Sequence, residues 1–248
     1  MITDILTVMW KDSKGLMRQG GSRARGAASQ LIVPAMWAIM LPIQLGSDLF
    51  SHSFTLIAAF VVPMLVVGIT VPESFAGERE RHTLETLLAS RLPDRAILFG
   101  KLGLAIIYGW GMAVATLLLS AVVANAVGWK GQVMFFTPPI LLANLAISLL
   151  ASGLMAGLGV LISLRSATAM GATQALMMFL IVPVVILQIA LPLLLFVVPN
   201  GMAILQRLLK SLDFAPVMLV LGAVLLVIDV ALFLAAMARF QRARLILD

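Results

Sequence analysis

The chain has 248 residues, of which 62% are hydrophobic and 11% are charged, and its net charge is +6. The charged fraction is less than half of the roughly 25% typical of soluble domains, and the mean hydropathy is +1.10. Several continuous apolar runs reach the roughly 20 residues needed to cross a bilayer, whereas the strands of a membrane β-barrel would alternate in polarity. We therefore expect an all-α polytopic membrane protein, with residues 1–248 forming a single transmembrane domain.

The first 18 residues have the pattern of an amphipathic helix that lies in the membrane interface. Apolar side chains recur at helical spacing, and a tryptophan stands among basic residues, a combination typical of helices at the level of the lipid headgroups. The apolar positions are Ile2, Ile5, Leu6, Met9 and Leu16, and the interfacial ones are Trp10, Lys11, Lys14 and Arg18. We predict an interfacial helix over residues 1–18.

Six apolar runs follow, and we predict that each crosses the membrane as a helix. The predicted spans are 27–45, 54–71, 97–127, 138–164, 169–190 and 214–238. The fifth run stays apolar to residue 198, which is about 45 Å as a straight helix and too long for one upright crossing. Because Pro183 and Pro192 can break a helix, we predict that this crossing ends near Ala190. Residues 191–212 would then form a re-entrant or outer interfacial segment.

The basic residues are distributed unequally between the two sides that this topology defines. If Lys101, at the start of span three, is counted with the loop before it, fourteen of the 17 lysines and arginines lie before the first span, between spans two and three, between spans four and five, or after span six. Because cytoplasmic loops carry the excess of basic residues, we expect both termini in the cytoplasm. We expect an integral protein of a bacterial or archaeal plasma membrane.

The densest group of charges lies between the second and third predicted spans. Ser74 can cap a helix start, and Leu92-Pro93 can end that helix, because proline disfavours the α conformation of the preceding residue. We therefore predict a cytoplasmic helix over residues 74–92. Its leucine face is Leu84, Leu87 and Leu88, and the polar residues around that face are Glu78, Arg79, Glu80, Arg81, Thr83 and Glu85. Such a helix suits a groove on a soluble partner, although a solvated helix without a partner is the alternative.

This charged loop resembles a motif of the ABC type-2 permeases, the membrane subunits of ATP-binding-cassette exporters. The chain reads Glu78-Arg-Glu-Arg-His-Thr-Leu-Glu-Thr-Leu-Leu88, followed by Pro93 and by Gly100-Lys101. The family pattern is Glu-x-Glu-x-Gly-Thr-Leu-Glu-x-Leu-Leu, which ends in a Gly-Lys entering span three. His82 departs from this pattern, because the family usually has glycine there. The resemblance extends over the interfacial helix, the six spans and the region before the last span.

The resemblance implies a type-2 ABC exporter fold and a mechanism for it. The loop would be the coupling helix, inserted into a cleft on a separate ATPase subunit, and two ATPase subunits that close on ATP would switch the spans between inward-open and outward-open states. The chain has no Gly-x-x-x-x-Gly-Lys-[Ser/Thr] phosphate loop, so ATP and Mg²⁺ would bind to the partner and this chain would carry no cofactor. A second permease copy is expected, by default in a homodimer.

Polar residues within the predicted spans are candidates for a substrate path or for buried packing contacts. Asp229 is the one acid deep in a span, where a charged side chain costs roughly 2.5–3.5 kcal/mol on insertion scales. It can contact a substrate or a proton, or it can form a packing hydrogen bond with another buried polar residue. The possible partners are Asn144, Gln174 and Gln188. Gly153 and Gly157 predict close helix packing, with a dimer seam or a substrate groove as the alternative.

Other functions have less support in the sequence. His52 and His82 are the only histidines, cysteine is absent, and neither His-Glu-x-x-His nor Gly-x-Ser-x-Gly occurs. We therefore expect no catalytic residue and no metal site, and the basic balance predicts membrane topology rather than a nucleic-acid partner. An ion-coupled secondary transporter would need internal repeats and several ionisable groups at mid-membrane. A scaffold subunit that recruits a soluble partner without transport is the other alternative.

Overall fold

The computed structural model describes residues 1–18, 24–51, 54–81, 83, 91–129, 131–198, 200–202 and 213–240. Within these ranges the regular structure is entirely helical, so the expected all-α architecture is confirmed. The helices are α1 (Ile2–Arg18), α2 (Ala24–Leu45), the 3₁₀ helix η1 (Gly46–Phe50), α3 (Thr55–Glu80), α5 (Asp94–Val127), α6 (Pro138–Ser163), α7 (Ala169–Val197) and α9 (Phe214–Arg239).

Five of the described helices are long and apolar enough to cross a membrane: α3, α5, α6, α7 and α9. The protein is therefore an integral membrane protein. The apolar part of α2 runs only from Leu31 to Leu45, which rises about 22 Å against a bilayer core of about 30 Å. The crossing by α2, and with it the count of six spans, stays a prediction.

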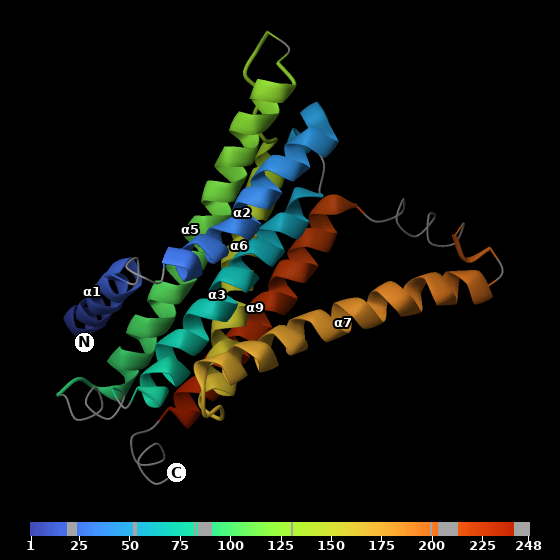
Figure 1. Ribbon diagram of the computed structural model, residues 1–248. Coiled ribbons are helices and arrows are strands. Elements are labelled where there is room, and N and C mark those ends of the chain that lie inside the picture. The colour runs from blue at the N-terminus through green and yellow to red at the C-terminus, as the bar shows by residue number, and fades with distance from the viewer. Residues whose placement is uncertain are drawn as a thin grey trace.

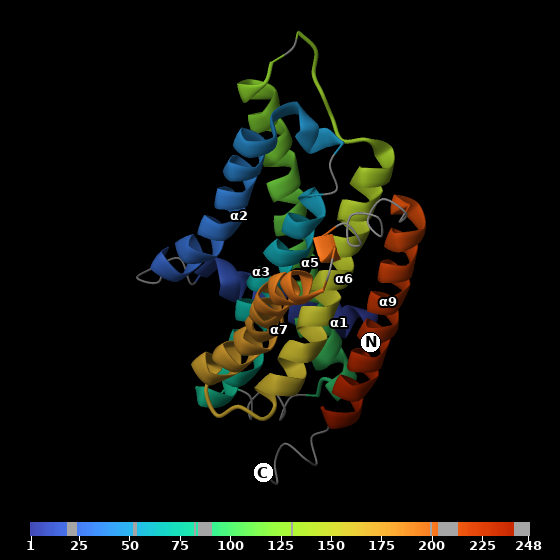
Figure 2. The ribbon, with the colours of Figure 1, turned by 90° about the vertical axis from the view of Figure 1, so that its right-hand side faces the viewer.

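Helix α3 is at the centre of the bundle. It contacts α2, α5, α6 and α7, while α9 packs on α6 and α1 packs on α5. Figures 1 and 2 show α2, α3, α5, α6 and α9 running along the bundle, with α1 beside the first turns of α5 and α7 leaving the bundle obliquely. Val62 and Val67 of α3 are completely buried, so the core lies around this helix.

The two ends of the bundle are held by different chemistry. At one end, η1 and the segment before α6 meet through apolar contacts: the Phe50 and Phe136 rings lie edge to face at 5.3 Å. The Thr137 N–H also donates to the Phe50 carbonyl at 3.1 Å. At the opposite end, ion pairs and hydrogen bonds join the end of α3 to the start of α5 and to the turn between α6 and α7, beside an edge-to-face pair of Phe75 and Phe240 at 5.9 Å.

The predicted break between a span ending at Val71 and a new helix starting at Ser74 is wrong. Helix α3 continues for 26 residues from Thr55 to Glu80, with Pro72 inside it and Ser74 in its interior rather than at a cap. An apolar environment penalises any unpaired backbone group, and neighbouring helices keep proline-containing helices intact. Residues 84–90 of the predicted coupling helix, including Leu84, Glu85, Leu87 and Leu88, lie outside the described residues.

The predicted break after Ala190 is also wrong. Helix α7 runs without interruption for 29 residues to Val197, and both Pro183 and Pro192 lie within it. Residues 191–197 therefore continue the helix, since in an apolar environment a break would leave further backbone groups unpaired. The interfacial segment predicted after them falls largely on residues 203–212, outside the described part of the chain.

Gly100 determines how closely α1 packs on α5. A Cβ atom on Gly100 would lie 2.7 Å from the Val8 Cβ and 3.2 Å from the Ile5 carbonyl oxygen. Val8 is 2% exposed, whereas Leu6 is 58% exposed. The face of α1 that packs on the bundle is thus centred on Val8, a residue that the predicted apolar face did not include.

We expect Gly100→Ala to lower the free energy of unfolding by about 1–3 kcal/mol, because the added methyl group overpacks the contact with Val8. Gly103→Ala is the matched control, since its Cβ would lie 3.8 Å from the flexible Met9 side chain. Unfolding in detergent micelles measures both. Adding Val8→Ala to Gly100→Ala should recover part of the loss, and no recovery would contradict the packing explanation.

Candidate functional site

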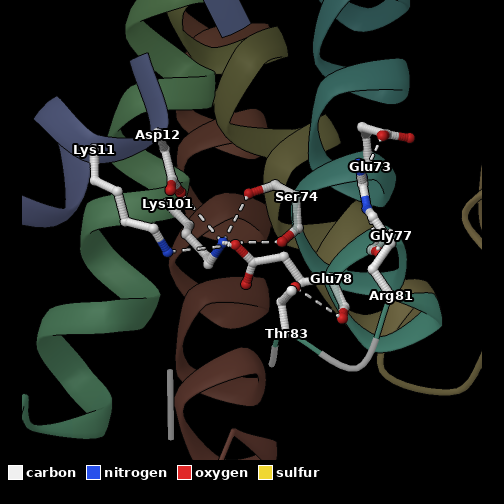
Figure 3. A network of polar contacts seen from close by, with 9 residues as sticks. All are labelled: Lys11, Asp12, Glu73, Ser74, Gly77, Glu78, Arg81, Thr83 and Lys101. Atoms are coloured by element: carbon white, nitrogen blue, oxygen red, sulfur yellow. Dashed lines mark hydrogen bonds and ion pairs between the residues drawn. The ribbon is translucent and has the colours of Figure 1, made fainter. Parts of the chain in front are cut away.

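The most buried charge in the described chain is the ammonium of Lys101, one turn into the apolar part of α5. Its side chain has no solvent exposure. The Nζ atom lies 2.9 Å from Glu78 Oε1 and 3.2 Å from Asp12 Oδ2, and it donates to the Ser74 carbonyl at 2.9 Å. Figure 3 shows these groups meeting around Lys101 from α1 and α3. A single side chain therefore joins three helices.

This arrangement solves the problem of a buried charge. An unpaired ammonium away from water is strongly unfavourable, and it is tolerated only with opposite charges and hydrogen-bond acceptors around it. Lys101 has two carboxylates and a backbone carbonyl, and Lys11 Nζ lies 3.8 Å from the same Glu78 Oε1. Gly100, the preceding residue, lets α1 approach closely enough to bring Asp12 to Lys101. Gly100 and Lys101 thus both contribute to the contact between α1 and α5.

Arg79 and Glu80, which follow Glu78 in α3, bind the turn between α6 and α7. Arg79 Nη1 donates to the Leu164 carbonyl at 3.1 Å, and Glu80 Oε2 accepts from the Ala169 N–H at 3.1 Å. The first is a cation at the C-terminal end of α6 and the second is an anion at the N-terminal end of α7. Both charges interact favourably with the dipole of the helix end that they contact. The two hydrogen bonds also satisfy backbone groups that a helix end leaves unpaired.

Arg81, at the end of α3, makes its contacts within its own helix. Its guanidinium pairs with Glu73 and donates from Nε to the Gly77 carbonyl at 2.9 Å. Thr83 lies just beyond and donates to the Glu78 carbonyl at 3.2 Å. Glu80, Arg81 and Thr83 are exposed, so these three side chains remain accessible from solvent.

The polar residues predicted around the leucine face, where the structure describes them, therefore fall into an exposed group and a partly buried group. Glu78 and Arg79 are partly buried and bind α5, α1 and the end of α6. Sequence reasoning missed Asp12, placed Lys11 only among the interfacial residues of the first helix, and noted Lys101 only as part of a motif. The available signal was a lysine that directly follows a glycine inside an apolar run. A charge in that position needs partners from other helices.

The polar residues predicted within the spans do not form one site. Asn144 of α6 is buried and donates to Thr55 Oγ1 at 3.0 Å and to the Ile140 carbonyl at 2.8 Å. Gln174 and Gln188 of α7 are exposed. None of the described hydrogen bonds joins any of these three residues to Asp229, so the predicted packing bond is not observed. A role in the substrate path stays a prediction.

Asp229 instead packs against the small-residue face of α6. It is 6% exposed, and its Oδ1 atom is buried without a hydrogen-bond partner among the described residues. A Cβ atom on Gly153 would lie 2.7 Å from Asp229 Oδ2, and one on Gly157 would lie 2.8 Å from the Leu232 Cβ. The two glycines therefore let α9 approach α6, which is the close packing that their spacing predicts.

Replacing Lys101 with methionine should lower the free energy of unfolding by about 3–5 kcal/mol, because the partly buried carboxylates of Asp12 and Glu78 lose their counter-charge. Lys14→Met removes an exposed lysine from the neighbouring helix and should change stability by less than about 1 kcal/mol. Reversible unfolding in mixed detergent–SDS micelles measures both variants. Equal effects of the two would contradict the assigned role of Lys101.

For the α6–α9 contact, Gly153→Ala should destabilise the protein by about 1–3 kcal/mol, because the methyl group overlaps the Asp229 carboxylate. Gly222→Ala, where the nearest side-chain atom is 4.0 Å away, is the control on α9. The double variant with Asp229→Ala should be more stable than the sum of the single changes predicts. Thermal unfolding of all four variants tests this, and strict additivity would argue against direct contact.

Comparison with known proteins agrees with the resemblance of the charged loop. A family model described as ABC-2 family transporter protein matches residues 5–245. No curated protein and no solved structure gives a match. Members of this family are membrane components of ABC transporters, which implies transport and an ABC ATPase partner. Because the match covers nearly the whole sequence, the chain belongs to the ABC-2 family of transporter proteins.

Proposed function

We propose that this chain is the permease subunit of an ABC exporter, which forms the translocation path and is driven by a separate ATPase subunit. The observation that carries the proposal is the set of contacts at the end of α3. Consecutive residues there bind α5 and α1 through Glu78, the end of α6 through Arg79 and the start of α7 through Glu80. A displacement of the loop that follows would therefore reach four other helices at once.

In this proposal the loop after α3 is the coupling segment, and its leucines fill a cleft on the ATPase. Closure of two ATPase subunits on ATP displaces the loop, and the bundle responds through the contacts of Glu78, Arg79 and Glu80. The paired partner is a second copy of this chain, and both termini face the cytoplasm together with the basic segments. ATP and Mg²⁺ belong to the ATPase, and the substrate leaves the cytoplasm.

The ionic contacts favour this proposal over the two alternatives. An ion-coupled carrier would place its ionisable groups near the middle of the membrane, at the interface of structural repeats. Here the ion pairs that join separate helices (Lys101 with Asp12 and Glu78, and Lys11 with Glu78) all lie at one end of the described bundle, beside the charged loop. A scaffold subunit would need the loop to bind a partner but would not need links to α5, α6 and α7.

Leu87→Asp or Leu88→Asp should leave the protein in the membrane and abolish binding of the ATPase, because a carboxylate replaces an apolar side chain in a closed pocket. Thr86→Asp adds the same charge off the leucine face and should keep binding. The measurement is purification of the tagged permease in mild detergent, with the co-purifying phosphate-loop ATPase identified by mass spectrometry and by vanadate-sensitive ATP hydrolysis. Undiminished ATPase binding by both leucine variants would refute the coupling assignment.

The same preparation separates the alternatives. A reconstituted permease–ATPase complex should hydrolyse ATP faster in the presence of its cargo, and cargo movement should stop without ATP. Transport by the permease alone on an ion gradient would support the secondary carrier. Stable ATPase binding with neither stimulation nor transport would support the scaffold.

A further inference from the structure

Helix α7 is attached to the described bundle at one end. Ala172 and Leu176, near its start, have no solvent exposure, and the helix contacts α3 and α6. From Ile181 to Leu194 every side chain that the structure describes is exposed. Figure 1 shows the result, because α7 begins beside the lower end of α3 and then diverges from α3, α6 and α9.

A helix attached in this way amplifies motion at its base. With 29 residues and a rise of about 1.5 Å per residue, α7 is roughly 44 Å long, so a rotation of about 10° at its base displaces its far end by roughly 7 Å. The contacts that orient the base therefore decide where the rest of α7 lies.

Besides the apolar packing of Ala172 and Leu176, the base of α7 has polar contacts that come from two adjacent residues of α3. Arg79 binds the last turn of α6 at the Leu164 carbonyl, and Glu80 binds the first N–H of α7 at Ala169. Neighbouring residues of a helix point about 100° apart, which lets one side chain reach each side of the α6–α7 turn. They are the last two residues of α3, which ends at Glu80. A movement of the following loop would displace them together.

We propose that Arg79 and Glu80 are positioning residues that set the direction of α7 and connect the loop after α3 to it. The transmission from an ATPase rests on the proposed function, but the positioning of α7 does not, because the contacts lie within one chain. This assigns to Arg79 and Glu80 an internal role in place of the partner-binding role that the sequence predicts for them.

The absence of cysteine from the chain permits a direct test with site-specific spin labels. Labels at Val122→Cys on α5 and Phe196→Cys on α7 occupy positions that are 65% and 89% exposed. The full-length protein is reconstituted in lipid nanodiscs, and the distance between the labels is measured by double electron–electron resonance. Dilution with unlabelled protein removes distances between copies.

The combination Arg79→Met with Glu80→Ala should shift or broaden the distance distribution by roughly 5–10 Å, from the lever length of α7. Arg79→Lys with Glu80→Gln keeps a donor and an acceptor at the same places and should restore a narrow distribution. Arg81→Met is the matched control, since this neighbouring arginine pairs within α3. A distribution that overlays the wild type, or an equal change in Arg81→Met, would overturn the proposal.

Adding the co-purifying ATPase with ATP and vanadate separates this proposal from the proposed function. If both are right, nucleotide shifts the distance in the wild type and fails to shift it in the Arg79→Met, Glu80→Ala variant. A variant effect in the isolated protein without any nucleotide response in the wild type would refute ATPase coupling and leave the positioning role standing. A normal nucleotide response in the variant would refute the positioning role alone.

Discussion

The buried ammonium of Lys101 is the constraint on which one end of this bundle depends. A lysine without solvent exposure is stable only if acceptors are brought to it from other helices. Asp12 supplies one from α1, and Glu78 and Ser74 supply others from α3. The close approach of α1 at Gly100 and the continuation of α3 beyond Pro72 both serve this contact.

The two ends of the bundle differ in the contacts that join their helices. Around Phe50 and Phe136 the contacts are apolar, and apolar contacts are non-directional. At the end of α3, apolar contacts such as that of Phe75 with Phe240 are joined by polar contacts, each of which links a particular donor to a particular acceptor and needs a defined geometry. A displacement of α3 there is expressed as a change in specific partners on α5, α6 and α7.

The two wrong sequence predictions have one cause. The predicted helix cap at Ser74 and the predicted break before Pro192 rest on rules that hold where water can bind a freed backbone group. In an apolar environment no such substitute exists, so ending a helix at a proline would leave further backbone groups unpaired. Helices α3 and α7 therefore run through Pro72, Pro183 and Pro192. By contrast, α5 begins directly after Pro93, next to the polar loop.

The sequence by itself determined the class of protein, the positions of the long apolar helices and the family motif, because hydrophobicity and motif spacing are local properties of the chain. It also indicated that Gly153 and Gly157 pack closely. Only the tertiary structure decided which charges meet. Arg79 and Leu164 are 85 positions apart, Glu80 and Ala169 are 89, and Lys101 and Asp12 are also 89. No local pattern encodes such pairs, since they depend on how five helices pack and on the exclusion of water between them.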